Sequence, residues 1–492
     1  MYAGTAIAAF ISRTFFIQIL GVQYLGISGL YSNILSMLAL SDLGLNVVML
    51  YSLYKPLAEH DTQKIAVLIR YYKKIYYIIA SVVLALGLMC IPILPYVVKN
   101  SLLTPHELVV YYVLILLNSI CSYLVVSKIT LIRADQKAFI VQMVTTGCTV
   151  VMHVFQIVML YYTGNYTAYL LIQIAFTLLS NLILSAIANR KYPYLKESTH
   201  LSIGKEQRRE IVGNLKSTFL YKVGAVIMNS TDNILISVLL GTVVVGYYSN
   251  YLVIIAMVNN VIAILVQAVL ASVGNYNATQ NSESKYQLFR FMMMGFYALA
   301  GFCAACYICI FDDFIKLWIG EEFILPKEFL YALVVNSFVL CILNPLWMTR
   351  ESAGVFKSIK YLMLCAAALN IGLSVLLGKT FGLGGIILAT AIAQLLTIFW
   401  YEPKILCKKV FSTTLRKYWE LVAKLLGTCI PIVVVGCLLQ QWVSVNPLVM
   451  VLKISTCALA TVISFRVMFS GSDEMAKAES IISNLPIIKK II

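Results

Sequence analysis

Residues 75–98 have the sequence IYYIIASVVLALGLMCIPILPYVV, without a single charged side chain. About 20 apolar residues in a helix are enough to cross the hydrocarbon core of a bilayer. The stretch is continuously apolar and does not alternate with polar residues, which is typical of a helix and not of a barrel strand. It therefore predicts a transmembrane helix.

Similar runs recur along all 492 residues, of which 61% are hydrophobic and only 12% charged, a balance that excludes a soluble domain. We predict an all-α polytopic membrane protein with about fourteen transmembrane helices. The predicted spans lie near 1–20, 28–52, 75–98, 107–127, 139–162, 168–188, 217–240, 247–271, 288–311, 328–348, 361–378, 386–401, 421–440 and 447–466. The segments between them are too short to fold as a catalytic domain, so no enzymatic activity is expected.

The formal net charge is +16, but the basic residues are not spread evenly. They gather in alternate loops, while the opposite loops contain only Lys99, Lys316, Lys327 and Lys379. Basic residues accumulate in cytoplasmic loops, so this asymmetry predicts that both termini are cytoplasmic. The same distribution argues against a nucleic-acid partner.

Three of the twelve cysteines, Cys303, Cys306 and Cys309, have a C-x2-C-x2-C spacing that resembles an iron–sulfur motif. Their surroundings, GFCAACYICIF, are an apolar span with no fourth cysteine nearby. We interpret them as buried apolar side chains, and expect neither a metal nor a cofactor.

A short motif occurs twice, as GLYSN at residues 29–33 and GYYSN at residues 246–250. Each follows a predicted outer turn that begins with Leu-Gly, at Leu20-Gly21 and Leu240-Gly241. The motifs are 217 residues apart and the turns 220, so we expect the two turns to differ by three residues. This placement predicts two parallel six-helix bundles related by a pseudo-two-fold axis, plus two C-terminal helices.

The predicted organisation follows from this repeat. It comprises an N-terminal six-helix bundle (1–188), a basic cytoplasmic linker (189–216), a second six-helix bundle (217–401), a cytoplasmic loop (402–420), two extra transmembrane helices (421–466) and a cytoplasmic tail (467–492).

Ionisable residues at membrane depth are costly and usually face the interior of a bundle. Arg13, Asp42, Lys222 and Asp232 are such residues. The 220-residue offset places Arg13 opposite Asp232, so we expect these two charges to face each other, as a functional site or as a structural ion pair. Two further buried cations, Lys424 and Lys453, are expected to extend toward the lipid headgroups.

Uncharged polar residues recur at helical spacing in four spans, including Gln142 and His153, Asn181, Asn229 and Asn233, and Asn260. Each set lies on one helix face, which predicts a water-accessible cavity between the two helical bundles; hydrogen bonding between helices is the alternative. His153 is either a hydrogen-bonded core residue or a proton site. Arg350 follows Asn344-Pro345, which should break a helix, and either lines the inner mouth or anchors at the interface.

Two runs carry a family resemblance: FISRTFFIQILGVQYLGISGLYSNILSMLALSDLGL, with the nearby LYKPLAEHD, and KVGAVIMNSTDNILISVLLGTVVVGYYSNYLVI. They resemble bacterial flippases for lipid-linked oligosaccharide repeat units. These form the Wzx-type polysaccharide transport family of the multidrug/oligosaccharidyl-lipid/polysaccharide exporter superfamily. The family typically carries a short basic segment before its first helix, and we expect such a segment ahead of Met1.

The resemblance implies an undecaprenyl-pyrophosphate-linked oligosaccharide as substrate. It would be moved from the inner to the outer leaflet of the bacterial cytoplasmic membrane by alternating access, for capsule, exopolysaccharide or O-antigen synthesis. Membrane lipid and the polysaccharide polymerase machinery would be its partners, and the protein would act as a monomer.

For such a substrate, we assign the headgroup contacts to Arg13, Lys222 and Arg350. Arginine binds phosphate through two parallel hydrogen bonds, and Lys222 would act as a point charge near the inner mouth. No P-loop motif is present, so an ion gradient is the expected driver, with Asp42, Asp232 or His153 as the titrating group.

Three alternatives remain open. One is a drug or cation exporter of the same superfamily, which should have a carboxylate-dominated cavity. The second is a lipid II flippase. The third is a membrane polysaccharide polymerase, which should show a large outer loop rich in arginine.

Overall fold

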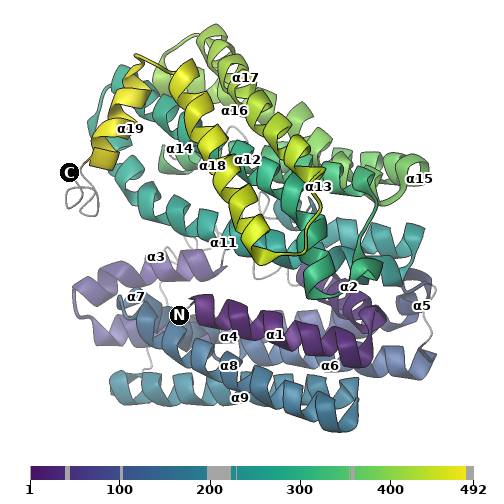
Figure 1. Ribbon diagram of the computed structural model, residues 1–492. Coiled ribbons are helices and arrows are strands. Elements are labelled where there is room, and N and C mark those ends of the chain that lie inside the picture. The colour runs from purple at the N-terminus through teal and green to yellow at the C-terminus, as the bar shows by residue number, and fades with distance from the viewer. Residues whose placement is uncertain are drawn as a thin grey trace. The chain divides into compact units, whose positions relative to one another are not determined.

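The computed structural model describes residues 2–38, 45–99, 103–196, 223–228, 230–353, 355 and 361–483. No strand occurs in these ranges, and the secondary structure is helical throughout (Figure 1). Eleven described helices are long and apolar enough to cross a membrane. The predicted all-α, multi-span fold is therefore confirmed.

These eleven spans differ from the fourteen predicted ones for identifiable reasons. One helical stretch, Leu362–Phe411, covers the two predicted spans 361–378 and 386–401. Its only non-helical backbone between them is at Gly382. Helix α1 (Tyr2–Leu20) occupies the first predicted span. The second prediction, 28–52, instead falls on two helices, α2 (Val22–Leu38) and α3 (Leu45–Ala58).

The chain divides into two compact units, Met1–Asn250 and Tyr251–Ile492. In the first, α8 packs against α1 and α9, and α6 against α4 and α9. After α3, the elements of this unit are α4 (Thr62–Met89), η2 (Ile91–Ile93), α5 (Leu94–Val97), α6 (Pro105–Tyr123), α7 (Val126–Ala134), α8 (Ala138–Thr163), α9 (Tyr166–Lys191), η3 (Pro193–Lys196), a helix at Val223–Leu240 and the start of α11 (Thr242–Thr279).

The second unit is built around α12, which packs against α13, α17 and α18. After α11, its elements are α12 (Ser282–Trp318), η4 (Glu321–Phe323), α13 (Lys327–Ile342), α14 (Asn344–Ser352), α15 (Leu362–Leu396), α16 (Ile398–Leu406), η5 (Cys407–Phe411), α17 (Leu415–Gln440), α18 (Pro447–Met468) and α19 (Asp473–Ser483).

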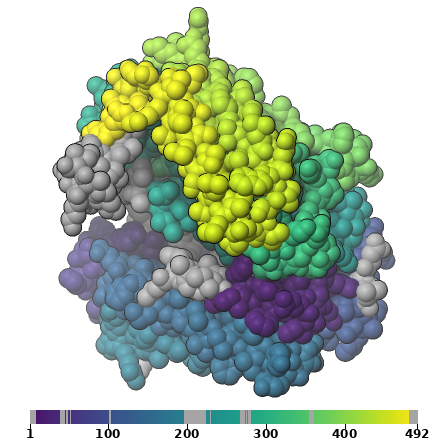
Figure 2. Space-filling model, in the orientation of Figure 1, coloured from purple at the N-terminus to yellow at the C-terminus, as the bar shows by residue number. Residues whose placement is uncertain are grey.

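Close packing joins α17 to α12. A Cβ added at Gly436 would lie only 2.7 Å from the Cα of Ala305, so only glycine allows this approach. The outer surface of α18, in yellow in Figure 2, carries exposed apolar side chains such as Leu448, Leu459 and Val467. That surface suits contact with lipid.

The repeat is visible at two equivalent helix junctions. Gly21 is the single residue between α1 and α2, and Gly241 is the single residue between helix Val223–Leu240 and α11. Both glycines have positive φ (87° and 103°). Their amides donate to Ile17 and Ser237, which are also 220 residues apart. The two junctions have the same length, so the expected three-residue difference between the turns is wrong.

In the 220-residue register, Gly26 corresponds to Gly246 and Tyr31 to Tyr251, whereas the GLYSN and GYYSN motifs fall three residues out of step. Both tyrosines are fully buried. Tyr31 donates to the carbonyl of Leu108 at the start of α6, and Tyr251 accepts from the amide of Leu325 just before α13. The residues that mark the repeat are therefore the Leu-Gly junctions with Gly26/Gly246 and Tyr31/Tyr251.

Gly26 and Gly246 also make reciprocal contacts within the first unit. A Cβ on Gly26 would clash with the carbonyl oxygen of Thr242, and a Cβ on Gly246 with that of Val22. Helix α2 and the first turns of α11 therefore cross with their backbones in contact, as small residues allow in membrane proteins.

We predict that Gly26→Ala lowers the thermal unfolding midpoint of the purified protein, because overpacking a close crossing costs about 1–3 kcal/mol. Gly29→Ala on the same helix is the matched control, since its Cβ would meet only Val245 Cγ1 at 3.8 Å. An equal shift of the midpoint in both variants would show that the α2–α11 crossing is not tight.

Candidate functional site

Arg13 on α1 is held by two side chains of the GYYSN motif. Its Nη2 donates to Ser249 Oγ at 2.5 Å and to Asn250 Oδ1 at 2.9 Å, and its Nε donates to the same Asn250 oxygen at 3.1 Å. All three residues belong to the first unit. The Ser249 hydroxyl donates to the carbonyl of Gly246 at 2.7 Å, so its lone pairs are turned toward the guanidinium.

These partners are neutral. A partly buried guanidinium needs hydrogen-bond acceptors, and amide and hydroxyl oxygens supply them without cancelling the positive charge. Within the described residues, Arg13 therefore remains a net positive centre fixed in position by its neighbours.

The described hydrogen-bond partners of Arg13 are Ser249 and Asn250, and not Asp232, the residue expected to face it. Asp232 and Asn233 lie buried on helix Val223–Leu240, but the guanidinium turns to the first turns of α11 instead. The carboxamide oxygen of Asn233, the residue equivalent to Arg13, has no hydrogen-bond partner in the described part of the chain. The register of the repeat was correct, but it could not show which neighbouring helix the long arginine side chain would reach.

A polar chain leads from the Arg13 region to His153. Tyr169 on α9 packs its ring against that of Phe16, one helical turn from Arg13 on α1, at a centroid distance of 5.0 Å. The backbone carbonyl of Tyr169 accepts a hydrogen bond from Gln156 at 3.4 Å, and Gln156 contacts His153 Nδ1 at 3.1 Å. His153 is therefore part of a hydrogen-bonded chain that reaches α9 beside Arg13.

Helices α8 and α9 line a cavity of about 290 Å³, to which Thr149 is the only contribution from the predicted polar face of α8. Asn181 lines it and donates to the carbonyl of Cys121 at 2.7 Å, which ties α9 to α6. The other polar residues at its wall are Ser122, Thr145, Thr149, Gln173, Thr177 and Ser180. Gln142 bonds to Thr146 on its own helix, and Asn260 is exposed on α11.

Three of the predicted site residues, Asp42, Lys222 and Asn229, lie outside the described residues. Arg350 is described, on α14, which begins at Asn344 after the predicted helix break. Its side chain is 3% exposed and forms an ion pair with Glu402, itself 2% exposed, while Glu351 lies 3.6 Å away. Arg350 already has carboxylate partners and does not offer a free cation to an anionic ligand.

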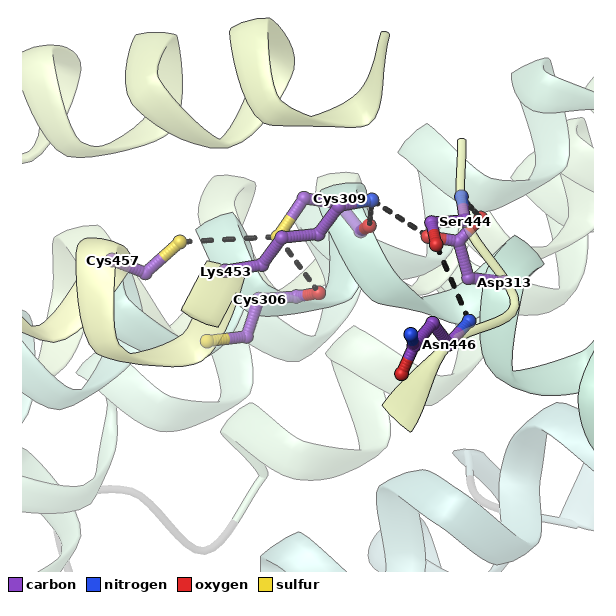
Figure 3. A network of polar contacts seen from close by, with 7 residues as sticks. All are labelled: Cys306, Cys309, Asp313, Ser444, Asn446, Lys453 and Cys457. Atoms are coloured by element: carbon purple, nitrogen blue, oxygen red, sulfur yellow. Dashed lines mark hydrogen bonds and ion pairs between the residues drawn. The ribbon is translucent and has the colours of Figure 1, made fainter. Parts of the chain in front are cut away.

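Sequence analysis missed a second buried ion pair, shown in Figure 3. Lys453 Nζ on α18 lies 2.6 Å from Asp313 Oδ2 on α12 and donates to the carbonyl of Cys309 at 3.0 Å. The two side chains are 1% and 5% exposed, so the expected extension of Lys453 toward headgroups is wrong. The predicted span ended at residue 311, but α12 runs on to Trp318 and carries Asp313 into the fold.

Sulfur atoms fill the space beside this pair. Cys309 Sγ lies 3.9 Å from Cys457 Sγ, and Cys306 lies one turn away on α12 (Figure 3). The second carboxylate oxygen of Asp313, Oδ1, accepts from the Ser444 amide at 3.3 Å. The pair thus fastens α18, and the segment before it, to the central helix of the second unit.

No protein-family model and no curated protein matches this sequence. Solved structures do match. The lipid II flippase MurJ, in an inward closed conformation, aligns over 94% of this chain and 97% of its own, with a TM-score of 0.67 and 12% identity. The chain has the fold of MurJ.

The same fold occurs in multidrug transporters. An inward-facing MATE transporter of the MOP superfamily covers 82% of this chain and 94% of its own, with a TM-score of 0.63 and 14% identity. The Vibrio cholerae MATE transporter VcmN gives a TM-score of 0.56 at 12% identity, with 83% of this chain and 95% of its own covered. At these identities the likeness establishes the fold, and the site residues must indicate the substrate.

Proposed function

We propose that this protein is a flippase of the bacterial cytoplasmic membrane. It moves undecaprenyl-pyrophosphate-linked oligosaccharide units from the inner to the outer leaflet, for capsule, exopolysaccharide or O-antigen synthesis, by alternating access. The observation that carries the proposal is Arg13, fixed by Ser249 and Asn250 with no carboxylate among its described partners.

The chemistry of a pyrophosphate headgroup fits this arrangement. A guanidinium binds phosphate oxygens through two parallel, charge-assisted hydrogen bonds, which are stronger than its bonds to neutral oxygens. A phosphate can therefore replace Ser249 and Asn250 as the partner of Arg13. The lipid tail stays in the bilayer while the headgroup crosses, so the protein needs to shelter only the polar part.

Arg13 also discriminates among the alternatives. A cation exporter requires negative charge at its binding site, and a permanently charged guanidinium would repel the substrate. A lipid II flippase is the second candidate, because the fold matches MurJ along nearly the whole chain. It would use the same pyrophosphate chemistry with a different sugar.

His153 is proposed as a group that couples transport to protons, through Gln156 and the Tyr169 backbone. Asp232 remains a further candidate for the coupling ion. Both lie on helices of the first unit, and both are buried or half-buried.

The test is to delete the gene and analyse the lipid-linked sugars that accumulate on the inner face of the membrane. The proposal expects an undecaprenyl-pyrophosphate-linked oligosaccharide, removed when the wild-type gene is restored. Accumulation of lipid II would favour the second candidate. Drug sensitivity with no accumulated lipid-linked sugar would contradict both.

A further inference from the structure

The first unit contains a second cavity, of about 370 Å³, where the connection between α8 and α9 meets the start of α6. Tyr24, Glu107, Tyr111, Asn165 and Tyr166 line it, on α2, α6 and α9. The cavity differs from the one beside Asn181, because polar atoms supply most of its lining, next to the rings of the three tyrosines.

The three tyrosine rings support one another. Ring centroids of Tyr111 and Tyr166 lie 4.7 Å apart, those of Tyr24 and Tyr166 5.2 Å apart, and both pairs are edge-to-face. Such packing fixes the orientation of the rings. Tyr166 is 2% exposed, and its hydroxyl is buried beside Ser28.

Two polar side chains at the rim are oriented by helix caps. Glu107 Oε2 accepts from both the amide and the hydroxyl of Thr104 at 2.8 Å, which holds the carboxylate in place at the cap. Asn165 Oδ1 accepts from the Thr167 amide at 2.8 Å, which leaves its amide nitrogen as a donor. The cavity therefore presents the Glu107 carboxylate as a hydrogen-bond acceptor and the Asn165 amide nitrogen as a donor, next to the three tyrosine rings.

This combination matches the chemistry of a sugar. A pyranose ring has an apolar C–H face that packs on aromatic rings, and neighbouring hydroxyls that donate to a carboxylate and accept from an amide. We propose that this cavity binds a sugar ring of the lipid-linked substrate. The identity of the occupant rests on the proposed function, whereas the sugar chemistry rests on the cavity itself.

The position of the cavity relative to Arg13 supports this occupant. Tyr166 stacks on Tyr169 at a centroid distance of 6.0 Å, one helical turn along α9, and Tyr169 reaches α1 one turn from Arg13. Phe16 on α1 packs against Tyr169 at 5.0 Å. An aromatic path thus connects the proposed phosphate contact to the proposed sugar site within the first unit.

The test uses the purified full chain in lipid nanodiscs and saturation-transfer NMR with free glucose, galactose and N-acetylglucosamine. At least one of these sugars is expected to receive saturation from the wild-type protein. Tyr24→Leu should reduce that signal about tenfold. Glu107→Gln keeps the helix cap but replaces one carboxylate oxygen, a hydrogen-bond acceptor, with an amide nitrogen, a donor. This variant should also weaken the signal.

Tyr161→Leu is the matched control, because Tyr161 is 73% exposed at the nearby end of α8 and should leave the signal unchanged. A thermal unfolding midpoint equal to that of the wild type confirms that each variant is folded.

Signals that do not change in Tyr24→Leu and Glu107→Gln, or no sugar signal at all, would overturn the sugar site. Choline serves as a second probe. A choline signal that Tyr24→Leu and Glu107→Gln both abolish, with no sugar signal from the wild type, would show that the cavity binds an organic cation. If sugar binding behaves as expected but the deletion strain accumulates no lipid-linked oligosaccharide, the proposed function fails and the sugar site stands.

Discussion

Replacing Arg13 with alanine is expected to abolish surface polysaccharide export while the protein remains in the membrane at its normal abundance. The variant loses at least two charge-assisted hydrogen bonds to phosphate, each worth about 1.5–3 kcal/mol. Loss of two such bonds, about 3–6 kcal/mol, corresponds to a decrease in headgroup affinity of about two to four orders of magnitude. Ser249 and Asn250 remain in the variant, but both are neutral, so no charge is left buried without a partner. Folding should therefore be preserved.

Two variants control for this result. Arg13→Lys keeps the positive charge but not the planar fork, and should retain partial export. Arg416→Ala removes an exposed arginine paired with Glu420 on α17, and should export normally. Full export by Arg13→Ala at normal abundance would rule out Arg13 as the headgroup contact.

The second large effect concerns the Lys453–Asp313 pair. Lys453→Met leaves the Asp313 carboxylate buried without its partner, and breaking a buried pair in this way costs about 3–5 kcal/mol. The thermal unfolding midpoint in detergent should fall sharply, and Asp313→Asn should have a similar effect. The double variant Lys453→Met/Asp313→Leu should recover much of the loss, because neither charge is then buried.

Lys424→Met provides the comparison. The Lys424 ammonium lies over the ring of Phe469 at 4.2 Å, a contact worth about 0.5–1 kcal/mol at an exposed site. The thermal unfolding midpoint of Lys424→Met should move far less than that of Lys453→Met.

If the double variant Lys453→Met/Asp313→Leu is as unstable as either single variant, the two side chains act through packing and not through their charges.

The fold could be predicted from the sequence because hydrophobicity alone specifies membrane spans. Apolar runs such as 75–98 are long, and the structure places the candidate span Thr62–Val97 there. The edges were less certain, since the chain does not mark where a helix leaves the membrane. The prediction that ended a span at residue 311 therefore assigned Asp313 to a loop, and left Lys453 without a partner.

The candidate site was predicted only in part. Sequence analysis selected Arg13 because a buried arginine is rare in a membrane helix, and selected the GYYSN motif because of its echo. The two copies of the motif are three residues out of register, so the reasoning from their similarity was wrong. Ser249 and Asn250 of GYYSN are nevertheless the residues that contact Arg13. Which helix a flexible side chain reaches depends on tertiary packing, which no repeat can specify. Arg350 shows the same limit, because Glu402 is far from it in sequence.

The central claim is that the protein moves a pyrophosphate-linked sugar lipid across the membrane and that Arg13 contacts the pyrophosphate. The most direct measurement reconstitutes the purified protein in vesicles with a labelled undecaprenyl-pyrophosphate-linked oligosaccharide and follows the rate at which the label becomes accessible on the opposite face. We expect the wild-type protein to exceed the protein-free rate, and Arg13→Ala to fall back to it. Equal rates for the wild type and Arg13→Ala, or no acceleration by the wild type, would contradict the claim.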